Sequence, residues 1–354
     1  MYAVGRGGFG KVWRVQSKKD KGEEFAMKEM AKARIITKKS VSSVMNELKL
    51  LSMVSSEFIV NVHYAFQDKM NLYLVMDLLL GGDLRYHIAR KRKFTMEITR
   101  FFIACLIHAL EAVHAACIIH RDIKPENLVF DNEGYLRLTD FGVARILSPE
   151  NASETSGTPG YMAPEVMCRQ NHGLAADYFA VGVIAYECMQ GKRPYVGRSR
   201  REIRDQILCK QVQIKKFEIP DGWNEKAADF INKCLQRKPQ NRIGFSKGTA
   251  ELKSHPWFDD FSWERLASKQ MQSQYVPDIQ VDNFDTNHVN NQEWKDAEAV
   301  KENEIHLLNP TTQQLFKGYY FDKMHQNNQG TLNHATMNKS TTGGNNEIAD
   351  TEGA

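Results

Sequence analysis

The sequence predicts an α+β protein in which a small antiparallel sheet with one main helix precedes a larger, mainly helical part. Around glycine-rich turns, the first eighty residues or so alternate β-branched and polar side chains. Residues 41–54 interrupt this pattern with apolar side chains at intervals of three and four, which indicates a helix. Beyond residue 82 the helical spacing dominates, for example between residues 98 and 113. These observations predict two lobes.

Composition and charge favour an ordinary globular protein. The 354 residues are 42% apolar and 25% charged, with a formal net charge of only +4. Because the basic residues are scattered, bulk charge gives no reason to expect nucleic acid or a membrane surface as a partner. No signal pattern opens the chain, and no uninterrupted apolar run approaches the ~18 residues of a spanning helix. We therefore expect a cytoplasmic protein without an integral membrane segment.

The cysteines indicate neither a disulfide framework nor a zinc site. Six are present, far apart and without a C-x-x-C pair: Cys105, Cys117, Cys168, Cys188, Cys209 and Cys234. We expect them to be buried thiols in a reducing compartment.

A glycine-rich loop lies between the first two strand-like runs. It comprises Gly5, Arg6, Gly7, Gly8, Phe9, Gly10, Lys11 and Val12. Glycines allow backbone N–H groups to approach phosphate oxygens closely. A hairpin turn without a ligand would look the same. No helix pattern follows, which argues against a dinucleotide site, and the G-x-x-x-x-G-K-[ST] pattern is absent.

A lysine and a glutamate form the next candidate pair. Lys28 lies in an apolar strand, and Glu47 lies on the polar side of the 41–54 helix. A lysine directed inward needs a carboxylate partner, and such a pair can hold phosphates. Taken alone, both residues would be read as solvated surface charges.

Three further motifs follow in order along the chain. The run from His120 to Asn127 matches H-R-D-x-x-x-x-N at every fixed position. Asp140-Phe141-Gly142 and Ala163-Pro164-Glu165 come after it. With these residues, the chain resembles the eukaryotic protein kinases over about residues 4–258, and the resemblance implies their bilobal fold.

The resemblance implies ATP and Mg²⁺ as the nucleotide substrate and metal, and a role for each catalytic residue. Asp122 would accept the proton of the substrate hydroxyl, and Lys28, held by Glu47, would bind the α- and β-phosphates. Lys124 would neutralise the γ-phosphate, and a lysine at this position is the form seen in serine/threonine kinases, which Thr158 also supports. The Mg²⁺ ligands would be Asn127 and Asp140. The implied nucleotide site comprises Val4, Gly5, Arg6, Gly7, Gly8, Phe9, Gly10, Val12, Ala26, Lys28, Met76, Asp77, Leu79, Asp83, Glu126, Val129 and Thr139.

Within the kinases, residues 78–87 resemble the AGC group, in particular the YANK family, and the chain is similar to cyclic-AMP-dependent catalytic subunits. The implied organisation is a kinase domain at 1–258, with an N-lobe at 1–76, a hinge at 77–83 and a C-lobe at 84–258. An AGC-type tail would span 259–323, followed by a disordered polar segment at 324–354. Asn283-Phe284-Asp285 resembles the tail motif that approaches the nucleotide, and Phe316 to Phe321 resembles the hydrophobic motif that docks beside the Glu47 helix. An amphipathic tail on the large lobe is the alternative.

The same resemblance makes predictions about substrates and regulation. Asp83, Glu126 and Glu187 occupy positions where basophilic AGC kinases bind arginines, so we expect protein substrates with basic residues before the target. Glu154 stands where an activating phosphothreonine is common. Its carboxylate could pair with Arg121 and order the loop, which predicts weak dependence on an upstream activating kinase. If the loop is one residue longer, Ser153, Thr155 or Ser156 is the phosphosite. Asp177 should brace the catalytic loop despite Phe179, which replaces the usual tryptophan, and Arg242 should pair with Glu165.

Two alternatives are weaker. A pseudokinase scaffold usually lacks a catalytic residue, whereas the catalytic set is complete here, and a kinase acting on small molecules would not need the Ala163-Pro164-Glu165 platform. The chain begins only four residues before Gly5, so the first strand is short, and the sequence leaves open whether the N-terminus is complete. We expect a monomer by default.

Overall fold

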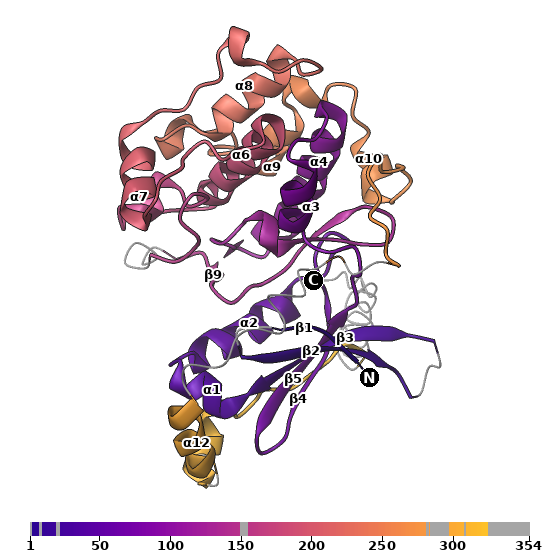
Figure 1. Ribbon diagram of the computed structural model, residues 1–354, viewed down its shortest axis with the longest axis vertical. Coiled ribbons are helices and arrows are strands. Elements are labelled where there is room, and N and C mark those ends of the chain that lie inside the picture. The colour runs from indigo at the N-terminus through magenta and orange to yellow at the C-terminus, as the bar shows by residue number, and fades with distance from the viewer. Residues whose placement is uncertain are drawn as a thin grey trace, which may run out of the picture.

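The computed structural model describes residues 2–6, 9–18, 22–148, 155–280, 283, 297–307 and 309–324, with backbone alone at 2–6, 297–299 and 302. It consists of two lobes (Figure 1). One contains the main sheet, and the other contains most of the helices. The α+β bilobal architecture that the sequence predicts is therefore confirmed.

The main sheet has the strand order β1-β2-β3-β5-β4-β10, and every neighbouring pair is antiparallel. Its strands are β1 (Tyr2–Arg6), β2 (Gly10–Gln16), β3 (Glu24–Ala31), β4 (Val62–Gln67), β5 (Asn71–Asp77) and β10 (Phe321–Asp322). In this register Val12 lies opposite Lys28, and Ala26 lies opposite Met76. Because directly opposed residues share a face, one face of the sheet carries Lys28 together with these three apolar side chains.

Two helices follow β3 along the chain, α1 (Lys32–Thr37) and α2 (Val41–Met53). The second is the helix that the 41–54 spacing predicts. Its buried apolar residues Val44, Leu48 and Leu51 join the core, and Glu47 is buried among them. The expectation that Glu47 lies on the polar side of the helix is therefore wrong. Burial of this apolar stripe therefore fixes where the Glu47 carboxylate lies.

The second lobe is built around α4 and α6, which are buried along most of their length. Figure 1 shows α3, α4, α6 and α8 gathered in this lobe. Its helices are α3 (Leu84–Lys91), α4 (Met96–Ala115), α5 (Pro164–Met167), α6 (Ala175–Gln190), α7 (Arg200–Cys209), α8 (Glu225–Cys234), α9 (Thr249–Lys253) and α10 (Trp263–Ala267). Short 3₁₀ turns are η1 (Pro125–Asn127), η3 (Lys216–Glu218), η4 (Pro239–Asn241) and η5 (Pro256–Phe258).

Two short strand pairs carry the loops that bear the sequence motifs. They are β6 (Ile118–Ile119) with β9 (Arg145–Ile146), and β7 (Leu128–Phe130) with β8 (Leu136–Leu138). The first pair flanks the start of the His120 run, and the second separates that run from Asp140-Phe141-Gly142. The motifs are thus held on both sides by antiparallel pairing.

Within the described residues, α4 alone has the length and apolar composition of a membrane span. It lies in the centre of the helical lobe, and 67% of its most apolar window is buried inside the protein. The core helix of a globular protein passes the same test, so this is weak evidence for a span.

Beyond residue 258 the chain runs from the helical lobe back to the sheet. The Tyr275 hydroxyl lies 2.7 Å from His87 Nδ1 on α3, and Asn283 Nδ2 donates to the Leu80 carbonyl at 3.1 Å. Farther on, α12 (Ala297–His306) packs against α1, where Asn303 Nδ2 donates to Thr37 Oγ1 at 3.0 Å. The chain then forms α13 (Pro310–Gln313), η6 (Gln314–Phe316) and β10. This segment links the two lobes.

The expectation that all six cysteines are buried is wrong. Cys105, Cys188 and Cys234 are buried on inward helix faces, and burial raises the pKa of Cys105 to about 12. The other three are exposed because they lie at helix ends or in turns: Cys117, Cys168 and Cys209. All six are free thiols.

Candidate active site

The glycine-rich segment forms a hairpin between β1 and β2. Gly5 pairs with Val12 and Arg6 with Lys11, while Gly7 and Gly8 lie outside the described residues. A Cβ atom at Gly10 would lie 1.8 Å from the Glu29 carbonyl oxygen, so the close approach of β2 and β3 requires glycine there. The hairpin thus stands at the edge of the sheet face that carries Lys28.

The Lys28 ion pair that the sequence predicts is present. Lys28 Nζ lies 3.0 Å from Glu47 Oε1, and the two side chains are 20% and 7% exposed. Burial alone would lower the pKa of Lys28, but the negative charges of Glu47 and Asp140 outweigh it and raise the pKa. The ammonium is therefore fully charged and points toward the segment that bears Asp140.

Helix α2 is tied to the Asp140-Phe141-Gly142 segment by two side-chain donors. Ser43 Oγ donates to the Gly142 carbonyl, and Asn46 Nδ2 donates to the Ala144 carbonyl at 3.0 Å. Phe141 is fully buried, with its ring centroid 5.1 Å from that of His120. These contacts hold Glu47 within reach of Lys28. The sequence did not predict these contacts of Ser43 and Asn46, because no sequence pattern identifies the partner of a polar residue on a helix face.

The carboxylate of the candidate base, Asp122, contacts three side chains, of which Asn127 Nδ2 is the most distant at 3.3 Å from Oδ2. Lys124 Nζ lies 2.6 Å from Oδ2, and Thr158 Oγ1 donates to Oδ1 at 2.7 Å. Lys124 Nζ also donates to Thr158 Oγ1 at 3.0 Å. The sequence marked Thr158 only as a sign of kinase class. The structure adds that it contacts the carboxylate directly, which ties the segment that presents a substrate to the candidate base.

The candidate Mg²⁺ ligands lie on either side of the β7–β8 hairpin. Asn127 Nδ2 donates to the Asp122 carbonyl at 2.8 Å, which directs its amide oxygen elsewhere. Asp140 is exposed and has a left-handed backbone (φ +66°). The Thr139 amide donates to the Asn127 carbonyl at 3.0 Å, so the two ligand-bearing segments are bonded to each other.

These two residues fit a metal that arrives with a nucleotide. No cluster of three or more His, Cys, Asp or Glu among the described residues could hold a metal ion by itself. Magnesium is usually bound by one or two protein oxygens together with substrate phosphates, so a complete protein cage is not needed.

The catalytic loop is braced from beneath by Asp177, as the sequence predicts. Its carboxylate accepts the backbone N–H groups of His120 and Arg121, both at 2.9 Å, and lies 2.8 Å from His114 Nε2. Burial would raise the pKa of Asp177, but these partners hold it below its usual value. Arg121 also has a left-handed backbone (φ +67°), so this brace holds the turn that presents Asp122.

Two carboxylates near the hinge have structural duties. Asp77 lies 2.6 Å from His63 Nε2 and 3.0 Å from Arg137 Nη1, and it accepts the Asn61 N–H at 2.9 Å. Burial would raise the pKa of Asp77, but the bonds from His63 and Asn61 lower it to about 2. Asp83 caps α3 by accepting the Tyr86 N–H at 2.8 Å, and burial raises its pKa. The Asp77 carboxylate is thus not available to a nucleotide, and the Asp77 backbone N–H already donates to the Asn61 carbonyl at 3.1 Å.

The comparisons with known proteins agree with this geometry. A family model for the protein kinase domain matches residues 1–258. The chain belongs to the protein kinase family.

Its relatives include serine/threonine kinases of the AGC group. A Dictyostelium discoideum protein named "Probable serine/threonine-protein kinase" is 38% identical over 80% of this chain and 62% of its own length. The RAC family serine/threonine-protein kinase homolog of that organism is 33% identical over 90% of this chain and 70% of its own length. Its cAMP-dependent protein kinase catalytic subunit is 36% identical over 78% of this chain and 42% of its own length. The chain thus spans about half the length of several curated relatives that it matches.

In this kinase the residues of the predicted hydrophobic motif lie beside the Glu47 helix. Phe316 and Tyr319 are fully buried, whereas Tyr320 is 66% exposed. The Phe316 carbonyl accepts from Gln67 Nε2 at 2.8 Å, and Lys32 Nζ lies 5.2 Å from its ring centroid. Tyr320 lines a hollow together with residues of α2. Phe284 and Asp285 of the other tail motif lie outside the described residues.

Glu165 and Arg242 form the second predicted ion pair. Arg242 donates to both Glu165 oxygens, at 2.7 and 3.0 Å, and both side chains are almost completely buried. Arg242 also donates to the Ala175 and Gln236 carbonyls, at 2.7 and 3.1 Å. The pair locks α5 against the loop around η4.

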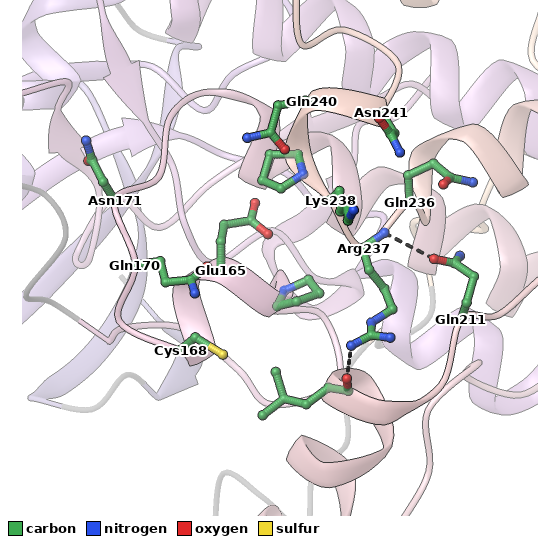
Figure 2. A pocket seen from close by; sticks show the side chains of 13 residues that line it. Glu165, Cys168, Gln170, Asn171, Gln211, Gln236, Arg237, Lys238, Gln240 and Asn241 are labelled. Carbon is green, nitrogen blue, oxygen red and sulfur yellow. Dashed lines mark hydrogen bonds between the residues drawn. The ribbon is translucent and has the colours of Figure 1, made fainter.

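A hollow of about 800 Å³ lies beside this pair. Figure 2 shows Gln170, Asn171 and Cys168 on one side and Gln211, Gln236 and Asn241 on the other, with Glu165 and Arg237 between them. Most of the labelled side chains are amides. The hollow therefore lacks the base and ligand set that surrounds Asp122, and it does not compete with that site as an active site.

Part of the activation segment is described. Thr155 Oγ1 accepts from Arg169 Nε at 3.2 Å, while Ser153 and Glu154 lie outside the described residues. The Arg121 guanidinium donates to the Val143 carbonyl at 2.8 and 2.6 Å. The pairing of Arg121 with Glu154 remains a prediction.

Sequence reasoning missed one residue at the substrate side. Arg85 belongs to the 78–87 motif, but its guanidinium contacts two of the three acidic residues assigned to substrate recognition, Glu126 and Glu187. These partners are 41 and 102 residues away. No spacing rule links positions so distant.

Proposed function

We propose that this chain is an active, ATP-dependent serine/threonine protein kinase that uses Mg²⁺. The observation that carries the proposal is the orientation of Asp122 by Lys124 and Thr158, with the Lys28–Glu47 pair formed at the same time. Asp122 accepts the proton from the substrate hydroxyl, and Lys124 places positive charge where charge develops on the transferred group. Bound ATP supplies the γ-phosphoryl group, and Mg²⁺ neutralises part of the phosphate charge.

We propose the following positions for the nucleotide. The sheet face with Val12 and Ala26 covers the adenine from one side and Val129 from the other. Met76 borders the pocket, and the backbone of residues 77–79 offers hydrogen bonds. Lys28 binds the phosphates beneath the glycine-rich hairpin, and Asn127 with Asp140 holds the metal. The alternation of the sheet supports this arrangement, because it puts Lys28 and the apolar contacts on the same face.

We propose protein substrates with a basic residue before the target serine or threonine. Glu126 supports this preference, because it is 43% exposed and lies in the catalytic loop itself. Glu187 is almost completely buried and already paired with Arg85, so the preference rests mainly on Glu126.

We further propose a monomeric cytoplasmic enzyme of intracellular signalling, with weak dependence on an upstream activating kinase. The hydrophobic motif supports the last point. Phe316, Tyr319 and Phe321 are buried. The fifth position of the motif is Tyr320, which serine/threonine kinases do not phosphorylate.

Transfer of labelled phosphate from ATP and Mg²⁺ to serine, threonine and tyrosine peptides tests the proposal. Asp122→Asn should lower kcat about 10²–10⁴-fold, since it removes the proton acceptor. Asp259→Asn is the matched control, because that aspartate is 58% exposed and pairs with Lys226 on the surface. Absence of transfer by the parent protein, with ATP bound, would instead indicate a scaffold that uses a kinase fold.

A further inference from the structure

The Arg85 guanidinium contacts two glutamate carboxylates in the helical lobe. Its Nη1 and Nη2 atoms donate to the two oxygens of Glu187 at 2.8 and 3.1 Å, and its Nε donates to Glu126 Oε1 at 3.1 Å. Nη2 also contacts the Tyr161 hydroxyl. A guanidinium fork that meets a carboxylate with two parallel bonds is the strongest common form of this contact.

Glu187 has little capacity left for another cation. Its side chain is 6% exposed, and both of its oxygens accept from Arg85. One of them also accepts from the Tyr161 hydroxyl at 2.6 Å. A second guanidinium could form the same two bonds only after Arg85 has left, because the positions that a bidentate cation uses are filled.

Glu126 differs in this respect. It is 43% exposed, and its contact with Arg85 uses one of its oxygens, Oε1. A substrate cation can therefore reach Glu126 while Arg85 stays in place. The two glutamates are thus unequal partners for a substrate, although they look equivalent in the sequence.

We propose that Arg85 is a specificity-determining residue that competes with a substrate arginine for Glu187 and so weakens the preference of this kinase for basic substrates. The proposal rests on the proposed function, because it concerns the substrate side of the same site. It implies that a kinase with these three acidic residues selects arginine less strongly than their charges suggest, and that removal of Arg85 exposes a second arginine-binding position.

Arg85 could act in the opposite way if its main effect were to orient Glu187 for the substrate. In that case its removal would disorder the carboxylate and weaken arginine selection. The buried hydrogen bond from Tyr161 argues against this, since it holds Glu187 without Arg85. The two mechanisms predict changes of opposite sign.

The test compares serine peptides that carry arginine or alanine at each position before the target. The ratio of kcat/KM for the two peptides measures arginine selection, and it is independent of the fraction of enzyme that folds. Arg85→Ala should raise this ratio about tenfold at one position where the parent shows little selection. The matched control is Arg90→Ala, which removes a cation of the same helix that stacks on Tyr86. It should leave the ratio unchanged. Adding Glu187→Gln to Arg85→Ala should reverse the gain.

Equilibrium binding of the same peptides, labelled with a fluorophore, separates this inference from the proposed function. If the parent bound peptide but transferred no phosphate, the proposed function would fail, and the affinity ratio would still decide the role of Arg85. An unchanged or lower arginine-to-alanine ratio in Arg85→Ala, in both measurements, would overturn the inference. An equal rise in Arg90→Ala would overturn it too, because the effect would then be one of general charge.

Discussion

Two ion pairs of the same chemistry have different surroundings in this protein. Lys28–Glu47 joins a strand to a helix through one contact of 3.0 Å, and the lysine keeps 20% of its side chain exposed. Glu165–Arg242 is bidentate, almost completely buried, and linked through Arg242 to two backbone carbonyls. The first pair leaves donors available to a ligand. The second uses its donors within the protein, so we assign it to the stability of the fold.

Double substitutions can separate the contribution of a pair to ligand binding from its contribution to stability. Replacing both members of a buried ion pair with apolar residues of similar size is often neutral, because it leaves no orphaned charge. The cost then depends on the other groups that lose a partner. Within the described residues, replacing Lys28 and Glu47 leaves no backbone carbonyl without a donor. Replacing Arg242 removes the donor of the Gln236 carbonyl and one of the two donors of the Ala175 carbonyl, which also accepts within α6.

The largest change in stability is expected for Arg242→Met with Glu165→Leu. The Gln236 carbonyl would lose its donor and the Ala175 carbonyl would keep only the intrahelical one, at about 1–3 kcal/mol for each lost bond. We expect the free energy of unfolding to fall by about 3 kcal/mol, measured by urea denaturation. A change below about 1 kcal/mol would mean that the pair does not hold α5 against the η4 loop.

The matched substitution, Lys28→Met with Glu47→Leu, should act on catalysis. We expect phosphate transfer to fall at least about a hundredfold, as when a preorganised charge is removed from an active site. Unfolding should change by no more than about 1 kcal/mol. Equal losses of stability in the two double variants would remove the distinction between the pairs.

Asp77, in the hinge, is a third charged residue whose charge we assign to the stability of the fold. Its pKa of about 2 in the folded protein lies below the ordinary value of 3.8, so folding favours the charged form. The contribution, about 2 kcal/mol, is present above about pH 4 and is lost as the pH falls toward 2. Asp77→Asn should therefore destabilise the protein at pH 7 and progressively less at lower pH. Urea denaturation between pH 7 and pH 3 checks this, and a pH-independent difference would show that Asp77 gains nothing from its charge.

The sequence predicted the elements that repeat a local pattern. The α2 helix, the glycine-rich hairpin and the catalytic loop follow from spacing and motif, and both ion pairs follow from the kinase resemblance. Contacts between residues without such a pattern were missed: Thr158 with Asp122, and Arg85 with Glu187. These depend on how the second lobe packs, which brings distant segments together through apolar burial that does not encode polar partners.

Burial of polar and thiol side chains was equally hard to predict. Residue type alone suggested six buried cysteines, but position at a helix end decided exposure for Cys117, Cys168 and Cys209. Asp77 was assigned to the nucleotide site through its place in the hinge, whereas its carboxylate turns to His63 and Arg137. In each case the direction of a side chain depends on tertiary contacts.

The most direct test of the distinction between the two ion pairs is the rise in melting temperature caused by ATP and Mg²⁺, measured for the parent and both double variants. Nucleotide at about a hundred times its Kd should stabilise the parent by about 2.7 kcal/mol, a rise of about 5 °C or more. The Arg242→Met, Glu165→Leu protein should show the same rise from a lower starting temperature, and the Lys28→Met, Glu47→Leu protein should show little or none. A full rise in the Lys28 variant, or none in the parent, would contradict the assignment of Lys28 to the phosphates.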